Sequence, residues 1–196
     1  MKLAFFAAHP SQYYIFRDII KESKNDDFIL VGFDKDILSE LVKNDDIKNP
    51  VFIIKNDKKN KFSFTSSFLK KVFHLYKIII KNKVKIILGT SITLVFAAKI
   101  AGIKSIILTE DDITVTKLSA YIGYWFCDYI LAPSSCYLGL WDKKSIRYNG
   151  YQKLVYLHPK YFSPNINIKK KYFLDENRKI FLLRFSLFFF IYSGRT

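Results

Sequence analysis

The chain has 196 residues, half of them apolar, and its 19 Phe and 13 Tyr exclude an intrinsically disordered protein. This length supplies one full hydrophobic core but is too short for two large domains. The formal net charge is +15, yet the lysines are scattered and match no nucleic-acid-binding module, so we expect no nucleic acid partner. A compositional origin of the lysines is favoured, and weak contact with an anionic membrane surface is the alternative.

The cysteines and the apolar runs predict a cytoplasmic location. Cys127 and Cys136 are too few for a disulfide framework and form no CxxC pair, which fits a reducing compartment. The apolar start ends at His9 and Pro10 and is too short for a signal peptide. Residues 180–192 are the most apolar stretch but are too short for a transmembrane helix. We therefore expect a cytoplasmic protein that is at most peripheral at the inner face of the membrane.

Short apolar strands alternate with helical segments along the chain. Strands are predicted at residues 2–7, 28–33, 51–54, 85–88, 105–108, 129–132 and 145–148. Helices are predicted at residues 12–23, 36–43, 68–82, 93–101 and 118–127. Asp36 is the expected N-cap of the second helix, and Gly102 the expected C-cap of the fourth. This alternation predicts an α/β fold, a doubly wound parallel sheet of the Rossmann-like type, with the first and fourth strands adjacent near its centre. Ligands of such sheets bind beyond the carboxyl ends of the strands.

Several common catalytic patterns are absent from the sequence. The seven glycines form neither a GxGxxG motif nor a P-loop, which argues against a nicotinamide enzyme and a P-loop phosphotransferase. The three histidines lie far apart, and no Cys/His spacing suits a metal ion. We therefore predict no cofactor and no metal site.

The residues after the first strand form one candidate site. His9 is a candidate general base, and Gln12 a candidate substrate-binding residue at a helix N-terminus, which favours anions. The alternative is that His9 is a turn residue and Ser11 caps the helix.

The residues after the fourth strand form a second candidate site. Gly89, Thr90 and Ser91 place a glycine and two hydroxyls at a helix start, where they can hold phosphate or sugar oxygens. A tight turn with a Thr or Ser cap explains the same residues.

Three adjacent carboxylates follow the fifth strand. Glu110 and Asp111 are candidate acid–base residues, because neighbouring carboxylates repel each other and raise one pKa, and Asp112 is a candidate ligand of sugar hydroxyls. Alternatively, these acidic residues stabilise the N-terminus of the next helix.

A fourth candidate site follows the short seventh strand. Gly150 suggests a turn with positive φ or a close approach to a ligand, and Asn149 and Tyr151 flank it as candidate substrate-binding residues. Tyrosines can stack on a sugar or a base, although burial against the core is their commoner use.

Several of these segments together resemble a known but uncharacterised family. The segments are His9-Pro10 with Phe16 and Ile19-Ile20, Gly89 to Ser91, Gly102 to Ile107 leading to Glu110 to Asp112, and Tyr148 to Pro164. They resemble the family called domain of unknown function 354, over roughly residues 1–187. The tyrosine-rich segment is the most specific of them.

The resemblance implies one half of a GT-B-like enzyme of surface polysaccharide metabolism, with two Rossmann-like domains around a cleft. The first expectation is the N-terminal, acceptor-side domain of a glycosyltransferase, with a sugar nucleotide or a glycan acceptor as partner. A sugar-nucleotide epimerase is the second expectation, and a non-catalytic remnant or binding module the third.

The resemblance also implies a domain organisation. Residues 1–165 correspond to the Rossmann-like N-terminal domain, and residues 166–196 to a linker and the truncated start of a second domain. In GT-B enzymes the second domain makes most nucleotide-sugar contacts, so we expect the chain to be inactive alone.

Overall fold

The computed structural model describes residues 1–22, 27–34, 37–45, 47–55, 64–115, 117–160, 162–172, 174–175, 178–181 and 183. The chain divides into two compact units, Met1–Phe162 and Ser163–Thr196. The described part of the second unit contains the four-residue helix α7 (Ile168–Lys171). No helix in the described part of the chain is long and apolar enough to cross a membrane.

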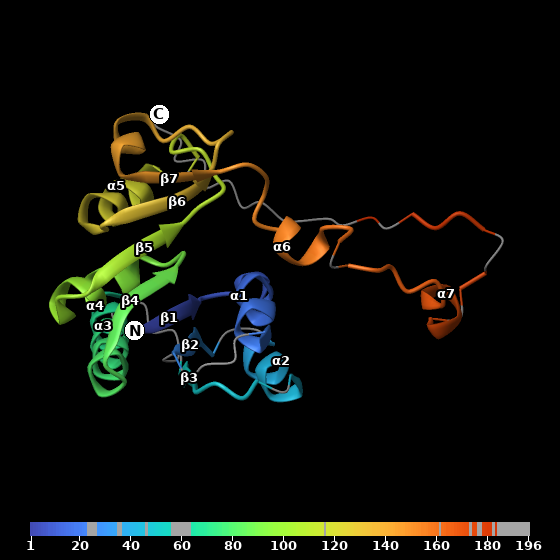
Figure 1. The fold of residues 1–196 in the computed structure, drawn as a ribbon, viewed down its shortest axis with the longest axis horizontal. Helices are drawn as coiled ribbons and strands as arrows, with labels where there is room; N and C mark the ends of the chain where they lie inside the picture. The colour runs from blue at the N-terminus through green and yellow to red at the C-terminus, as the bar shows by residue number, and fades with distance from the viewer. Residues whose placement is uncertain are drawn as a thin grey trace, which may run out of the picture. The chain divides into compact units, whose positions relative to one another are not determined.

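In the described residues of the first unit, seven parallel strands form one sheet. The strands are β1 (Lys2–Ala7), β2 (Phe28–Phe33), β3 (Val51–Ile54), β4 (Val84–Gly89), β5 (Lys104–Leu108), β6 (Tyr129–Pro133) and β7 (Ser145–Tyr148). Their order is β3-β2-β1-β4-β5-β6-β7, so β1 and β4 are adjacent at the centre, as predicted. Every neighbouring pair is parallel (Figure 1).

Helices cover both faces of this sheet, which confirms the predicted doubly wound Rossmann-like fold (Figure 1). One face carries α1 (Pro10–Glu22) and α2 (Leu38–Asn44). The other carries α3 (Phe64–Lys81), α4 (Ile92–Ala101) and α5 (Lys117–Phe126). A 3₁₀ helix, η1 (Gly139–Lys144), precedes β7, and the short helix α6 (Leu154–Leu157) follows it.

The burial of β1 shows why its sequence is apolar throughout. Ala4, Phe5, Phe6 and Ala7 are all buried, although successive residues of a strand point to opposite faces. Phe5 and Ala7 pack in the cluster under α1 and α2, and Ala4 and Phe6 pack in the cluster under α3, α4 and α5. A strand with both faces covered needs a continuous apolar run rather than an alternating one.

The ends of α4 fit the sequence interpretation. The Ser91 hydroxyl accepts a hydrogen bond from the Thr93 backbone N–H at 3.2 Å, so Ser91 is the N-cap. Gly102 ends the helix in the left-handed region, at φ 65°, as a C-cap glycine does. Asp36, the predicted cap of the second helix, lies outside the described residues.

Candidate functional site

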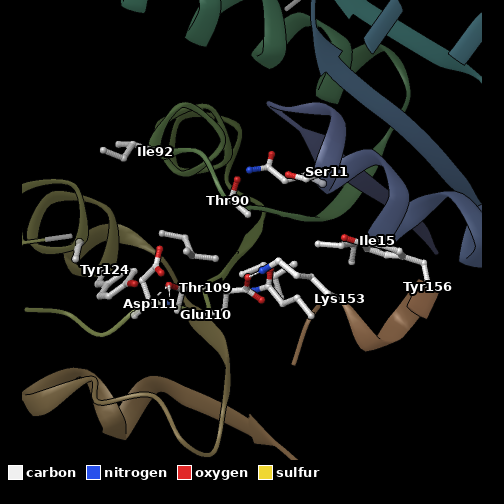
Figure 2. Close-up of a pocket in the computed structure, with 15 residues that line it drawn as sticks. Ser11, Ile15, Thr90, Ile92, Thr109, Glu110, Asp111, Tyr124, Lys153 and Tyr156 are labelled. Carbon is white, nitrogen blue, oxygen red and sulfur yellow. Dashed lines mark hydrogen bonds and ion pairs between the residues drawn. The ribbon is translucent and has the colours of Figure 1, made fainter. Parts of the chain in front are cut away.

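A cavity of about 260 Å³ lies at the carboxyl ends of the central strands (Figure 2). Its wall is formed by residues from α1, from the segments after β4 and β5, from α5, and from the segment around α6. These residues are Ser11, Gln12, Ile15, Thr90, Ile92, Ile107, Leu108, Thr109, Glu110, Asp111, Ala120, Tyr124, Gln152, Lys153 and Tyr156. Ligands of doubly wound sheets bind at this position, beyond the carboxyl ends of the strands.

An ion pair joins two parts of the cavity wall. Lys153 donates a hydrogen bond from Nζ to Glu110 Oε1, across 43 residues of sequence. The Glu110 side chain is 24% exposed and the Lys153 side chain 59% exposed. In Figure 2 the two side chains meet between Asp111 and Tyr124 on one side and Ile15 and Tyr156 on the other. The pair thus links the loop after β5 to the residue before α6.

One buried acceptor in the cavity wall, Glu110 Oε2, has no hydrogen-bond partner among the described residues. Gln152 is only 7% exposed, and its side chain interacts with the Tyr148 hydroxyl beside the cavity. Leaving a buried acceptor unpaired costs about 1–3 kcal/mol, so a donor such as a ligand hydroxyl would stabilise Glu110 Oε2.

His9 caps α1 rather than lining the cavity. The His9 backbone carbonyl accepts from the Gln12 and Tyr13 N–H groups, and its Nδ1 accepts from the Ser11 N–H at 3.3 Å. The Gln12 Oε1 atom in turn accepts from the Ala8 N–H at 2.7 Å, as in a capping box. The N-terminus of α1 thus places Ser11 and Gln12 in the cavity wall.

The residues after β4 divide between packing and the cavity. Gly89 is buried against β1, and Ser91 caps α4. Thr90 lies between them and lines the cavity, where Figure 2 shows its hydroxyl near the Ser11 end. Of the three predicted residues, Thr90 is therefore the one in contact with the cavity.

The three carboxylates after β5 also separate. Glu110 and Asp111 line the cavity, and the Asp111 N–H donates to the Thr109 hydroxyl at 3.4 Å. Asp112 instead accepts a hydrogen bond from the Tyr137 N–H at 2.7 Å. That bond ties the β5 loop to the segment after β6.

The turn after β7 lies beside the cavity rather than in its wall. Gly150 has the predicted positive φ, at 127°. Asn149 Oδ1 accepts a hydrogen bond from the Ser134 hydroxyl at 3.0 Å, and Tyr151 is exposed. The turn directs the chain toward Gln152 and Lys153, which do line the cavity.

The sequence interpretation missed the wall around α6. Gln152, Lys153 and Tyr156 line the cavity although no motif marked them. The Tyr156 ring lies 5.9 Å from the ring of Tyr14, which brings α6 against α1. A lysine that could pair with Glu110 was the one feature of the sequence that could have predicted this wall. The chain has so many lysines that the sequence could not identify which of them pairs with Glu110.

No group of three His, Cys, Asp or Glu side chains in the described residues could hold a metal ion. The two cysteines are buried and free, and burial raises the pKa of the Cys127 thiol to about 11. Cys127 is therefore protonated near neutral pH and is a poor nucleophile.

The sheet and its cavity define a Rossmann-like α/β domain of the kind that forms one half of a GT-B enzyme. Many solved structures share the fold, and three of them illustrate it. UDP-N-acetylglucosamine 2-epimerase from Rickettsia bellii has a TM-score of 0.62 and 15% sequence identity, and the match covers 89% of this chain and 52% of that chain. The S. aureus MnaA–UDP co-structure has a TM-score of 0.57 and 16% identity, with 88% of this chain and 52% of that chain covered. Anabaena Alr3699/HepE in complex with UDP has a TM-score of 0.53 and 15% identity, with 77% of this chain and 44% of that chain covered.

These identities establish likeness of fold. The chain spans about half the length of the three structures that it matches. Neither a protein-family model nor a curated protein matches the chain. The resemblance to a GT-B half is thus shown at the level of the fold, while the resemblance to the domain of unknown function 354 family stays a prediction.

Proposed function

We propose that the chain supplies the acceptor-side half of a GT-B glycosyltransferase-like enzyme, and that its cavity binds one sugar ring. The observation that carries the proposal is the composition of the cavity wall, where the Glu110 carboxylate, whose Oε2 has no partner among the described residues, lies with the Gln152 amide and the hydroxyls of Ser11 and Thr90. A sugar hydroxyl donates one hydrogen bond and accepts another, so vicinal hydroxyls suit a carboxylate and an amide together. Two structures with this fold contain UDP, which supports a sugar nucleotide as ligand.

The size of the cavity supports a single ring rather than a whole sugar nucleotide. Sites for drug-sized ligands have volumes of about 300–1,000 Å³, and this cavity has about 260 Å³. Hydroxyls of Ser11, Thr90 and Thr109 line it, as do the apolar side chains of Ile15 and Ile92. The remaining parts of a donor or an acceptor would extend out of the cavity.

Glu110 is the first choice for the acid–base group in this proposal. It lines the cavity, and Lys153 holds one of its oxygens while the other has no partner among the described residues. Asp111 lines the same cavity and is the second choice. His9 remains the third candidate for the acid–base group, at the N-terminus of α1, where its Nδ1 accepts a hydrogen bond from the Ser11 N–H.

A sugar-nucleotide epimerase is the second candidate, favoured by the Rickettsia bellii structure. A non-catalytic binding module is the third, favoured by the half-length coverage. Transfer and epimerisation need a closed cleft that excludes water. We propose that residues 1–196 alone bind sugar but do not turn it over, and that the full enzyme acts on surface polysaccharide precursors in the cytoplasm.

The test is a ligand-observed NMR titration of the full chain with N-acetylglucosamine, UDP and UDP-N-acetylglucosamine. The two sugar-bearing ligands are expected to bind, and UDP alone to bind more weakly. Glu110→Gln should weaken sugar binding about tenfold or more, because a hydrogen bond to a charged group contributes about 1.5–3 kcal/mol. Its thermal midpoint should stay unchanged, since the Glu110–Lys153 pair is partly exposed.

Glu40→Gln is the matched control, because Glu40 is exposed on α2. The proposal fails if neither sugar ligand binds saturably, or if Glu110→Gln and Glu40→Gln have equal effects. Release of UDP or appearance of a 2-epimer during the titration would show that the chain is active alone.

A further inference from the structure

The helical layer formed by α3, α4 and α5 exposes large apolar side chains to solvent. The exposed large apolar side chains on these helices include Leu69, Phe73, Ile100, Ile122, Trp125 and Phe126. We refer to the surface that they form as the α3–α5 face. In the described residues of α1 and α2, by contrast, Ile19 is the one large apolar residue classed as exposed. Among α1 to α5, exposed large apolar side chains are thus concentrated on α3, α4 and α5, and such patches mark interaction sites.

An apolar groove of about 500 Å³ opens between the three helices. Phe68, Phe96 and Ile122 line it, one from each helix. The Phe96 ring stands between the rings of Phe68 and Phe126, with centroid distances of 5.6 and 5.4 Å. The groove therefore extends the exposed apolar surface inward with aromatic walls.

The same layer carries a concentrated positive charge. Residues 64–109 contain no Asp, Glu or Arg. Their eight lysines are Lys70, Lys71, Lys77, Lys81, Lys83, Lys85, Lys99 and Lys104. Lys104 pairs with Asp128 at 2.7 Å, whereas Lys77 Nζ lies 4.4 Å from the centroid of the exposed Phe73 ring. Five of the eight lie on α3 and α4, and Lys77 contacts an exposed aromatic ring of the α3–α5 face; the five are Lys70, Lys71, Lys77, Lys81 and Lys99.

Apolar and aromatic side chains interspersed with lysines are suited to one kind of partner. Aromatic residues enter the boundary between lipid headgroups and acyl chains, and lysines bind anionic headgroups. A second copy of this face is disfavoured, because it would bring two sets of lysines together without carboxylates between them. We propose that the α3–α5 face is a docking surface for an anionic phospholipid membrane, independent of what the sugar cavity binds.

The test uses the full chain with vesicles of phosphatidylglycerol and phosphatidylcholine, and with vesicles of phosphatidylcholine alone. The chain has two tryptophans, of which Trp125 is 66% exposed and Trp141 5% exposed. Docking through the α3–α5 face should shift the tryptophan emission to the blue with anionic vesicles, and Trp125→Phe should abolish the shift. Raising salt should release the protein, because salt screens the attraction.

Vesicle sedimentation then separates the contributions of charge and apolar contact. Lys77→Gln and Lys99→Gln should each weaken binding about fivefold, since each basic residue near the membrane contributes about 1 kcal/mol. Trp125→Ser should weaken it by a similar factor. The matched controls Lys43→Gln and Ile19→Ser, on the α1–α2 side, should bind like the unaltered chain.

Three results would overturn the proposal. The first is absence of sedimentation with anionic vesicles, and the second is equal binding to both vesicle types. The third is sedimentation with anionic vesicles that shows no blue shift and is unchanged in the α3–α5 variants. That result would place the membrane contact elsewhere on the chain. Thermal midpoints of all variants, measured in parallel, show whether a loss of binding reflects a loss of folding.

Discussion

Gly89 shows how a residue that the sequence suggests for a ligand site can serve packing instead. An added Cβ would lie 2.4 Å from the Phe6 backbone oxygen and 2.9 Å from Leu94 Cδ2. Glycine therefore allows β4 to approach β1, and the neighbouring Thr90 reaches the cavity. The pattern of a glycine followed by hydroxyls located the site, but it could not separate the packing residue from the lining residue. That separation depends on side-chain directions set by the whole sheet.

Gly89→Ala should destabilise the protein by about 2–3 kcal/mol, because the clash is with backbone and cannot be relieved by a rotamer change. Gly123→Ala in α5 is the matched comparison. Its Cβ would lie 3.1 Å from the end of the Ile107 side chain and in ordinary contact with Ile92 Cγ1 at 3.6 Å, and alanine favours a helix over glycine by about 1 kcal/mol. Denaturant unfolding measures both variants. Equal stability of the two would show that the β1–β4 approach does not require glycine.

At the scale of elements, the strands were predictable and the helix starts were less so. Each strand was recognised as a short apolar run, and its ends differ from the prediction by at most one residue. The α1 helix begins at Pro10 rather than at residue 12, because proline suits the first helical position and His9 caps the helix. The α3 helix begins at Phe64 rather than at residue 68. Its first turn contains Thr and Ser, which mark no apolar periodicity.

Two carboxylates tie elements together and should make folding sensitive to acid. Asp45, after α2, accepts hydrogen bonds at 2.5 Å from the Tyr13 hydroxyl and from Lys21 of α1. Asp128 accepts hydrogen bonds from Lys104 and Ser105 of β5. Burial alone would raise each pKa, but these hydrogen bonds outweigh it and hold the pKa of both carboxyls below the usual 3.8.

Whether acid destabilises the folded protein depends on whether the folded or the unfolded chain binds protons at the higher pH. Because the folded-state pKa is lower, the unfolded chain is protonated first as the pH falls. The stability that the two carboxylates contribute is therefore complete above about pH 5 and lost from about pH 4 downward. Denaturant unfolding from pH 6 to pH 3 should show a shallower acid decline in the Asp45→Asn/Asp128→Asn double variant. A decline shared by the double variant and the unaltered chain would contradict the prediction.

At the scale of the whole molecule, the adjacency of the first and fourth strands near the centre was predicted from the sequence, but the complete cavity was not. Ligands of a doubly wound sheet bind beyond the carboxyl ends of the strands, so the rim after β1, β4 and β5 could be placed from the sequence. The wall from Gln152 to Tyr156 comes from a short helix after the last strand. Its ion pair to Glu110 spans 43 residues with no periodic signal between. The exposed α3–α5 face was also beyond prediction, because an apolar residue in a helix pattern is normally assigned to the core.

Both buried clusters lie within the first unit, and this determines what the chain needs for folding. The core residues of the two clusters all precede residue 142. No described residue from 163 onward is buried. The short α7 helix likewise has no buried residue. The folding free energy of the first unit should therefore come from contacts among residues 1–162.

We predict that a chain ending at Phe162 folds as cooperatively as residues 1–196, because the removed part contributes no buried side chain among its described residues. For a chain of this size a change of 1 kcal/mol shifts the thermal midpoint by about 2–4 °C, so the two midpoints should agree within that interval. The shorter chain should also keep the sugar binding and the vesicle binding of the longer one. Differential scanning calorimetry measures the midpoints, and limited proteolysis of the longer chain should cut first after residue 162. A drop of 10 °C or more in the shorter chain, or cleavage first within β1 to β6, would show that the second unit is needed to stabilise the first.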